Sequence, residues 1–167
     1  MTAAATTGPG GPAPLLALAH AAAAGVRARI AYREAGGEVR RREVEVLALG
    51  WRWGTWALLA HCHRRGALRI FLLDRIVEAR TGRRRARPHL PESAEAAEFA
   101  LADLQPPGIG PAVRLSLDVP VALVGVASVL FPGAPLEVGP GGRRVHLLVT
   151  DPAACRAMAA SLGLALG

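Results

Sequence analysis

The sequence predicts an α+β protein in which a helix and a small β-barrel are followed by an α/β sandwich. Three observations favour this fold class. Between residues 26 and 80, apolar and polar side chains alternate in short runs, which is the period of antiparallel strands with one buried face. Residues 13–25 place leucine and alanine at helical spacing instead. From residue 112 a new pattern begins, in the order strand, helix, strand, strand, helix.

Charge divides the chain near residue 90. Residues 1–90 hold 16 arginines and 6 acidic residues, whereas residues 91–167 hold 4 arginines and 7 acidic residues. A length of 167 residues can hold two compact domains. We therefore expect four segments, namely a disordered tail at 1–12, a barrel domain at 13–80, a basic linker with a short helix at 81–111, and a sandwich domain at 112–167.

Every cationic side chain that is not a histidine is an arginine, since the chain has no lysine. A GC-rich genome would also produce this composition. The planar guanidinium nevertheless pairs with phosphate in two-pronged fashion and stacks on bases, so we expect an anionic partner. No apolar run reaches the roughly 18 residues of a membrane span. The N-terminal residues lack the pattern of an export signal, so we expect a cytoplasmic protein.

Five strands are expected after the first helix, which has Pro14 in its first turn and ends at Gly25. They lie at 26–33, at 38–49, in the two arms of a hairpin over 56–76 that turns at Arg64–Ala67, and at 76–80. Short bent strands of this number close into a small barrel. Trp51 and Trp53 lie between the second strand and the hairpin, and we expect them to cover an open end of the barrel rather than present stacking faces.

Several arginines accompany these strands. Arg27, Arg29 and Arg33 alternate with apolar residues on the first strand and give it one arginine-bearing face. The run at 40–42 is interpreted as a bulge or a solvated edge rather than a binding motif. The arginines of 81–91 are interpreted as a solvated linker that adds only non-specific affinity for an anion.

The second half begins with an expected helix from Ser93 to Leu104, which Ser93 caps. The elements that follow are a strand at 113–118, a helix at 121–130, strands at 136–138 and 144–149, and a helix at 153–162 capped by Asp151. This order is that of a ferredoxin-like sandwich without its last strand. We expect that strand to be stunted at 164–167 or supplied by a partner.

The hairpin carries a recognisable series of residues. It combines Trp56, Leu58, the segment 60–63 reading Ala-His-Cys-His, Arg65-Gly66, Arg69 and Phe71, and Leu-Asp-Arg-Ile at 73–76. The series resembles the WYL domain of bacterial transcriptional regulators over roughly residues 13–80. One departure is that the tyrosine of the family's name is Ala57 here. The second half resembles WCX, the extension that follows WYL domains.

The resemblance implies an Sm- or SH3-like barrel, a role in regulating transcription, and sensing of a ligand or nucleic acid. Such regulators usually carry an N-terminal winged helix-turn-helix. Residues 1–12 leave no room for one. We therefore expect either that the chain is a fragment of a longer regulator or that a partner subunit with a helix-turn-helix reads duplex DNA.

The candidate binding residues are those of the hairpin. His61, His63 and Arg65 are expected on one side, with Arg69 joining them from the facing strand and Arg75 at the hairpin's end. Together they would hold a nucleotide or single-stranded nucleic acid by its phosphates. The alternative is a salt-bridged surface, in which Glu45, Asp74 and Glu78 neutralise these charges.

Metal binding and catalysis are not expected. The row His61-Cys62-His63 contains three ligand types, but alternation places Cys62 on the opposite face and leaves two imidazoles without a third ligand close in sequence. Cys62 and Cys155 are expected to be free thiols. No nucleophile–base pair or phosphate-binding glycine loop stands out, so we expect neither an enzyme nor a cofactor.

Two functions remain after these exclusions. The first is an effector-sensing regulatory protein that modulates transcription, and the alternative is a ligand-free structural or dimerisation module. A homodimer is expected in either case, through an unpaired strand edge or a helix face of residues 112–167. The helix faces concerned are Leu123, Ala127 and Leu130 on one helix, and Ala153, Ala157 and Ala160 on the other.

Overall fold

The computed structural model describes residues 12–87, residue 99 and residues 111–166. The tail expected at 1–12 and the helix expected at 93–104 lie outside the described residues, except for Pro12 and Phe99. None of the described helices is long and apolar enough to cross a membrane.

The first unit is a helix followed by a five-stranded antiparallel sheet. Its elements are α1 (Pro12–Ala24), β1 (Val26–Arg33), β2 (Val39–Arg52), β3 (Thr55–Cys62), β4 (Ala67–Leu72), the 3-10 turn η1 (Leu73–Arg75) and β5 (Ile76–Arg85). The strand order is β4-β3-β2-β1-β5. This confirms the helix and the five strands. The expected closed barrel is wrong for the described residues, in which β4 and β5 are the two edges of an open sheet and η1 joins them.

Two strands are longer than expected. β2 and β3 run through residues 50–55 and meet at a tight turn, in which Trp53 and Gly54 have φ of 54° and 73°. Two successive residues with positive φ are typical of a type I′ hairpin turn. Trp51 is buried edge-to-face against Trp56, whereas Trp53 is 61% exposed. Both tryptophans were expected to cover an open end of the barrel, but only Trp51 packs into the core.

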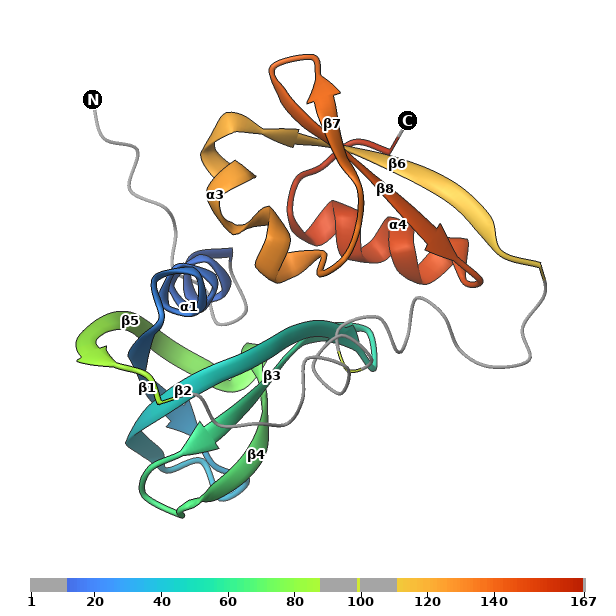
Figure 1. Ribbon diagram of the computed structural model, residues 1–167. Coiled ribbons are helices and arrows are strands. Elements are labelled where there is room, and N and C mark those ends of the chain that lie inside the picture. Colours follow the sequence, from blue (N-terminus) through green and yellow to red (C-terminus); the bar gives the residue numbers. More distant parts are fainter. Residues whose placement is uncertain (1–11, 88–98, 100–110, 167) are drawn as a thin grey trace, which may run out of the picture.

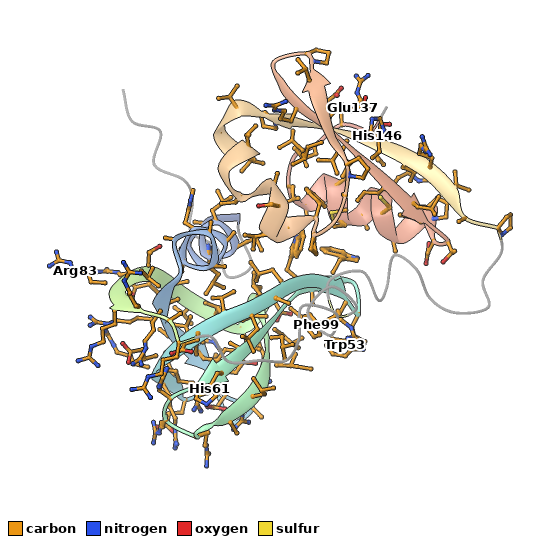
Figure 2. The ribbon with its side chains drawn as sticks, viewed as in Figure 1. Trp53, His61, Arg83, Phe99, Glu137 and His146 are labelled. Carbon is orange, nitrogen blue, oxygen red and sulfur yellow. The ribbon has the colours of Figure 1, made fainter. Side chains whose placement is uncertain are left out.

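The strand β5 continues to Arg85, through residues that were expected to be a linker. Arginine is compatible with an edge strand, because backbone pairing with β1 supplies the hydrogen bonds while the side chains stay in solvent. Figure 2 shows Arg83 pointing away from the sheet. Gly82 permits the close pairing, since a Cβ at this position would lie 2.6 Å from the carbonyl oxygen of Arg27.

The second unit has the expected order of elements. They are β6 (Val113–Pro120), α3 (Val121–Leu130), β7 (Leu136–Gly139), β8 (Gly142–Val149) and α4 (Pro152–Ser161). The sheet order is β6-β8-β7. Asp151 caps α4 by accepting hydrogen bonds from the backbone N–H groups of Ala153 and Ala154, each at 3.0 Å. The closing strand is reduced to a bridge between Leu117 and Leu166. The ferredoxin-like sandwich stays a prediction.

The two units share one apolar core. In Figure 1, α1 lies between the two sheets, and α3 and α4 lie on the side of the second sheet that faces it. The buried residues of both units form a continuous cluster, in which α1 contacts α3. The indole Nε1 of Trp56 in β3 donates a hydrogen bond to Ser161 Oγ at the end of α4.

Candidate anion-binding cleft and hairpin site

The hairpin places its two histidines together. His61 and His63 lie on one face of the strand, with ring centroids 5.1 Å apart, and Cys62 between them is fully buried on the other face. Gly66 has φ of 61°, as expected for the turn, and Arg65 is exposed there. The alternation within residues 61–63 is therefore as predicted.

Arg69 does not join the histidines. The register pairs His61 with Leu68 and Ala60 with Arg69. Directly opposite residues share a face of the sheet, so Arg69 lies on the face opposite to His61. It is close enough to Glu34 to help lower the pKa of that carboxyl, which is lowered mainly by a hydrogen bond from Arg42. The expected convergence is wrong for Arg69.

Arg75 is also apart from the histidines. Its guanidinium carbon lies 6.0 Å from the ring centroid of Tyr32, which is buried on the inner face of β1 and packs edge-to-face on Phe71. This distance is at the limit of a cation–π contact. Arg75 thus lies beside the inner aromatic residues, and the five expected site residues do not form one group.

A cleft lies on the outer face of β1, β2 and β5. Its volume is about 590 Å³, and its lining includes five arginines and two glutamates. The lining residues are Arg29, Ile30, Ala31, Arg41, Arg42, Glu43, Glu78, Arg80 and Arg84. Figure 2 shows nitrogen-tipped side chains gathered on this side of the first sheet. Positive charge exceeds negative charge around the cleft.

The pairing of β1 with β2 and β5 brings several of these charges close together. Arg29 on β1 lies directly opposite Arg80 on β5, and on its other side it faces Glu43 on β2. Like charges directly opposite each other are destabilising unless another charge offsets them. Arg41 lies diagonally from Arg29, because it pairs with Ala31. Three guanidinium groups from three strands therefore surround one depression.

The acidic residues of the cleft are already paired. Glu78 accepts a hydrogen bond from Arg80, and Glu43 lies 3.1 Å from Arg27 and 3.7 Å from Arg84. Within the part of the chain that the structure describes, neither Arg29 nor Arg41 has an acidic side chain at ion-pair distance. Their positive charges remain available to an anion.

Two groups of arginines in the sequence, on the first strand and at residues 40–42, already pointed to this cleft. The arginine-bearing face of β1 was recognised, but the run at 40–42 was interpreted as a bulge or solvated edge. Of that run, Arg41 points into the cleft, whereas Arg42 is 5% exposed and hydrogen-bonds to Glu34 and Cys62 Sγ. The hydrogen bond to Glu34 raises the pKa of Arg42. Strand alternation assigns these neighbours to opposite faces.

A buried carboxylate lies beside the histidines. Glu45 is 1% exposed and sits on β2 directly opposite His61. Its Oε1 is 2.9 Å from Nε2 of His63 and accepts a hydrogen bond from Arg27 Nε at 3.1 Å. Glu45 is thus a third ligand-type residue that comes from the neighbouring strand, so residue spacing close to the histidines does not reveal it.

A polar row crosses the outer face of the second sheet. Ser116 Oγ lies 2.9 Å from His146 Nδ1, and His146 Nε2 lies 3.1 Å from Glu137 Oε2. These are the groups of a nucleophile, a base and an orienting carboxylate. The Glu137 side chain is 68% exposed, so water screens the pair, and strands hold all three groups on an open face. We therefore interpret the row as a surface hydrogen-bonding group, in which Ser116 and Glu137 are the partners of the half-buried His146.

Comparison with known proteins identifies the type of domain in the first unit. The family model for the WYL domain matches residues 14–81. The chain contains a WYL domain. No curated protein matches the chain. Among solved structures, the chain is similar to proteasome accessory factor B/C (PafBC) of Arthrobacter aurescens, with 26% identity and a TM-score of 0.44 over 92% of this chain and 23% of that chain. The chain thus spans about a quarter of that protein's length.

The WYL match includes the residues of both the cleft and the hairpin. It runs from residue 14 to residue 81 and therefore covers all but the start of α1, β1 to β4 and the first part of β5. Arg29, Arg41 and Arg80 of the cleft all lie within it, as do Glu45 and both histidines. WCX stays a prediction for the second unit.

Proposed function

We propose that this protein is an effector-sensing regulator of the WYL type, which binds a nucleotide or single-stranded nucleic acid and modulates transcription. The observation that carries the proposal is the pairing of Arg29 with Arg80 in a cleft that also receives Arg41. A phosphate between these guanidinium groups would relieve their repulsion and accept charge-assisted hydrogen bonds. A cleft of about 590 Å³ has the size of a small-molecule site.

Transmission of the signal would use the shared core. β1 and β2 line the cleft on their outer face and contact α1 through their inner face, and β2 also contacts α3. A helix-turn-helix partner subunit would read the duplex, and the second unit would hold two copies of the chain together. The protein would be cytoplasmic, where such a partner and its DNA are found.

Salt-dependent binding tests the proposal. Fluorescence anisotropy of a labelled single-stranded oligonucleotide, with mononucleotides as competitors, should show affinity that falls as salt rises, because phosphate neutralisation releases counterions. Arg29→Gln with Arg41→Gln should weaken binding at least about tenfold and reduce the salt slope by about 1.4, at roughly 0.7 per phosphate contact on a single strand.

A matched double variant controls for net charge. Arg114→Gln with Arg156→Gln removes the same charge from exposed positions on β6 and α4, outside the cleft. It should leave affinity and slope nearly unchanged. Equal losses in the two double variants would mean diffuse electrostatic attraction. No salt-dependent binding by the parent protein would favour the alternative, a ligand-free structural or dimerisation module.

A further inference from the structure

The geometry points to a binding site for a divalent transition-metal ion such as Zn²⁺, formed by Glu45, His61 and His63. The inference is independent of the function proposed for the arginine cleft. One potential ligand atom from each of the three side chains lies within 4.8 Å of the other two. Glu45 Oε1 and His63 Nε2 lie 2.9 Å apart.

Strand alternation and cross-strand pairing bring these ligands together. His61 and His63 project from one face of the end of β3, because residues two apart on a strand share a face. Glu45 projects from the same face of β2, because it is the direct cross-strand partner of His61. Figure 2 shows His61 on the first sheet, remote from His146 and Glu137 on the second.

The separations require only a small adjustment. Metal–ligand distances of about 2.0–2.1 Å place tetrahedral ligand atoms roughly 3.4 Å apart. The widest separation, 4.8 Å, must therefore shrink by somewhat more than 1 Å. Rotation of the two half-buried imidazoles supplies such a movement, whereas the buried Glu45 stays in place.

The chemistry of the set selects the class of ion. Two imidazole nitrogens and one carboxylate oxygen suit Zn²⁺ and its late first-row neighbours, and they leave a fourth position for water or a ligand. Ca²⁺ and Mg²⁺ prefer sites made of oxygen atoms and should bind poorly. The set contains no thiolate, since Cys62 is buried on the opposite face, where Arg42 Nη1 lies 3.8 Å from its sulfur.

Arg27 orients the carboxylate. Its Nε donates to Glu45 Oε1, and its Nη1 lies 3.1 Å from Glu43 Oε2, so the guanidinium is held between two carboxylates. Hydrogen bonds of this kind to a ligating carboxylate are the usual outer shell of a metal site. The positive charge of Arg27 also lowers the affinity for a cation, so we expect micromolar rather than picomolar binding.

Calorimetric titration of Zn²⁺ into the untagged, chelator-treated full chain tests the site. We expect one equivalent to bind, and His61→Ala and His63→Ala each to weaken binding at least about tenfold. His63→Gln keeps a side-chain amide beside Glu45 while removing the imidazole, and it should lose affinity although the fold, checked by circular dichroism, is retained. Co²⁺ should bind with the intense visible absorption of a tetrahedral complex.

Two matched variants should bind Zn²⁺ as the parent protein does. His20→Ala removes an exposed histidine of α1, and Cys62→Ala removes the thiol between the two imidazoles. Equal loss in either of these would identify adventitious or thiolate binding and overturn the site. So would undiminished binding in the three His61 and His63 variants, or no uptake of Zn²⁺ by the parent protein at submillimolar concentration.

Discussion

The indole nitrogen of Trp56 lies 2.8 Å from the hydroxyl oxygen of Ser161 and donates a hydrogen bond to it. The two residues are 105 positions apart and belong to different units of the structure. The Ser161 hydroxyl in turn donates a hydrogen bond to the carbonyl oxygen of Met158 at 2.6 Å, so one hydroxyl joins the WYL hairpin to the last turn of α4.

The first prediction concerns this link. Ser161→Ala leaves the buried indole N–H of Trp56 without its acceptor, which should cost about 1–3 kcal/mol of unfolding free energy. All three tryptophans lie at residues 51–56 in the first unit, so tryptophan fluorescence should report a substitution made in the second. Ser116→Ala, which removes a hydroxyl from the outer face of β6, serves as the control. An unchanged emission spectrum and midpoint in Ser161→Ala would show that the link is not formed in solution.

The second prediction concerns Gly82. Gly82→Ala would place a Cβ 2.6 Å from the backbone oxygen of Arg27, so β5 must move away from β1 at some cost. We expect a loss of about 1–3 kcal/mol, as for other overpacked sites, together with weaker binding at the cleft, which β5 helps to line. Gly36→Ala is the matched control, since nothing lies within 4 Å of the new methyl group there. Equal urea midpoints for the two variants would contradict the close pairing.

The third prediction separates the hairpin arginines from the cleft. Arg69→Ala with Arg75→Ala removes two arginines on the inner side of the sheet, and sequence reasoning expects this change to weaken anion binding. The register instead predicts a smaller loss of oligonucleotide affinity than in the Arg29 and Arg41 double variant. Loss of the Arg75–Tyr32 contact should also lower stability by about 0.5–1 kcal/mol. Anisotropy and thermal unfolding of both double variants decide between the two sets of arginines.

The fourth prediction concerns acid. The hydrogen bond from Arg42 lowers the pKa of Glu34 from its usual 4.5. A carboxyl whose pKa is lowered by folding stabilises the protein above its unfolded pKa, and this stabilisation is lost as pH falls from about 4.5 through the folded value. Glu34→Gln should therefore be less stable than the parent protein at pH 7, and the difference should close on acidification. A difference that stays constant from pH 7 to pH 3 in urea titrations would contradict the ion pair.

The fifth prediction concerns association. Ala127 and Leu130 of α3 are buried in the shared core, so only part of the expected helix surface remains. Ala153, Ala157 and Ala160 are exposed on α4, and Val138 on the edge strand β7 is 84% exposed. Val138→Lys should convert a dimer that uses this edge to a monomer in sedimentation experiments, because edge lysine prevents strand pairing. Arg156→Lys on α4 is a conservative control. A dimer that persists in Val138→Lys would exclude the β7 edge.

Local patterns were sufficient for most elements of secondary structure. Asp151, Pro152 and Gly163 mark the ends of α4, and Gly66 marks the hairpin turn, because capping and positive φ depend on a few neighbouring residues. The failures have local causes as well. The turn at Trp53 and Gly54 was missed because a tryptophan with positive φ is rare, and the extension of β5 was missed because arginine-rich segments usually remain solvated.

The sequence by itself determined which faces of the strands carry charge, whereas only the tertiary structure decided which charges meet. Arg69 and Leu68 exchange faces if the hairpin register moves by one residue, so no local pattern could assign Arg69 to the side opposite His61. Arg29 lies opposite Arg80 only because strands about 50 residues apart in the chain pair with each other. Glu45 lies opposite His61 only because a bulge after Val46 shifts the register of β2 and β3. Cross-strand register is set by the packing of the whole core, and for that reason both candidate sites appear only in the folded chain.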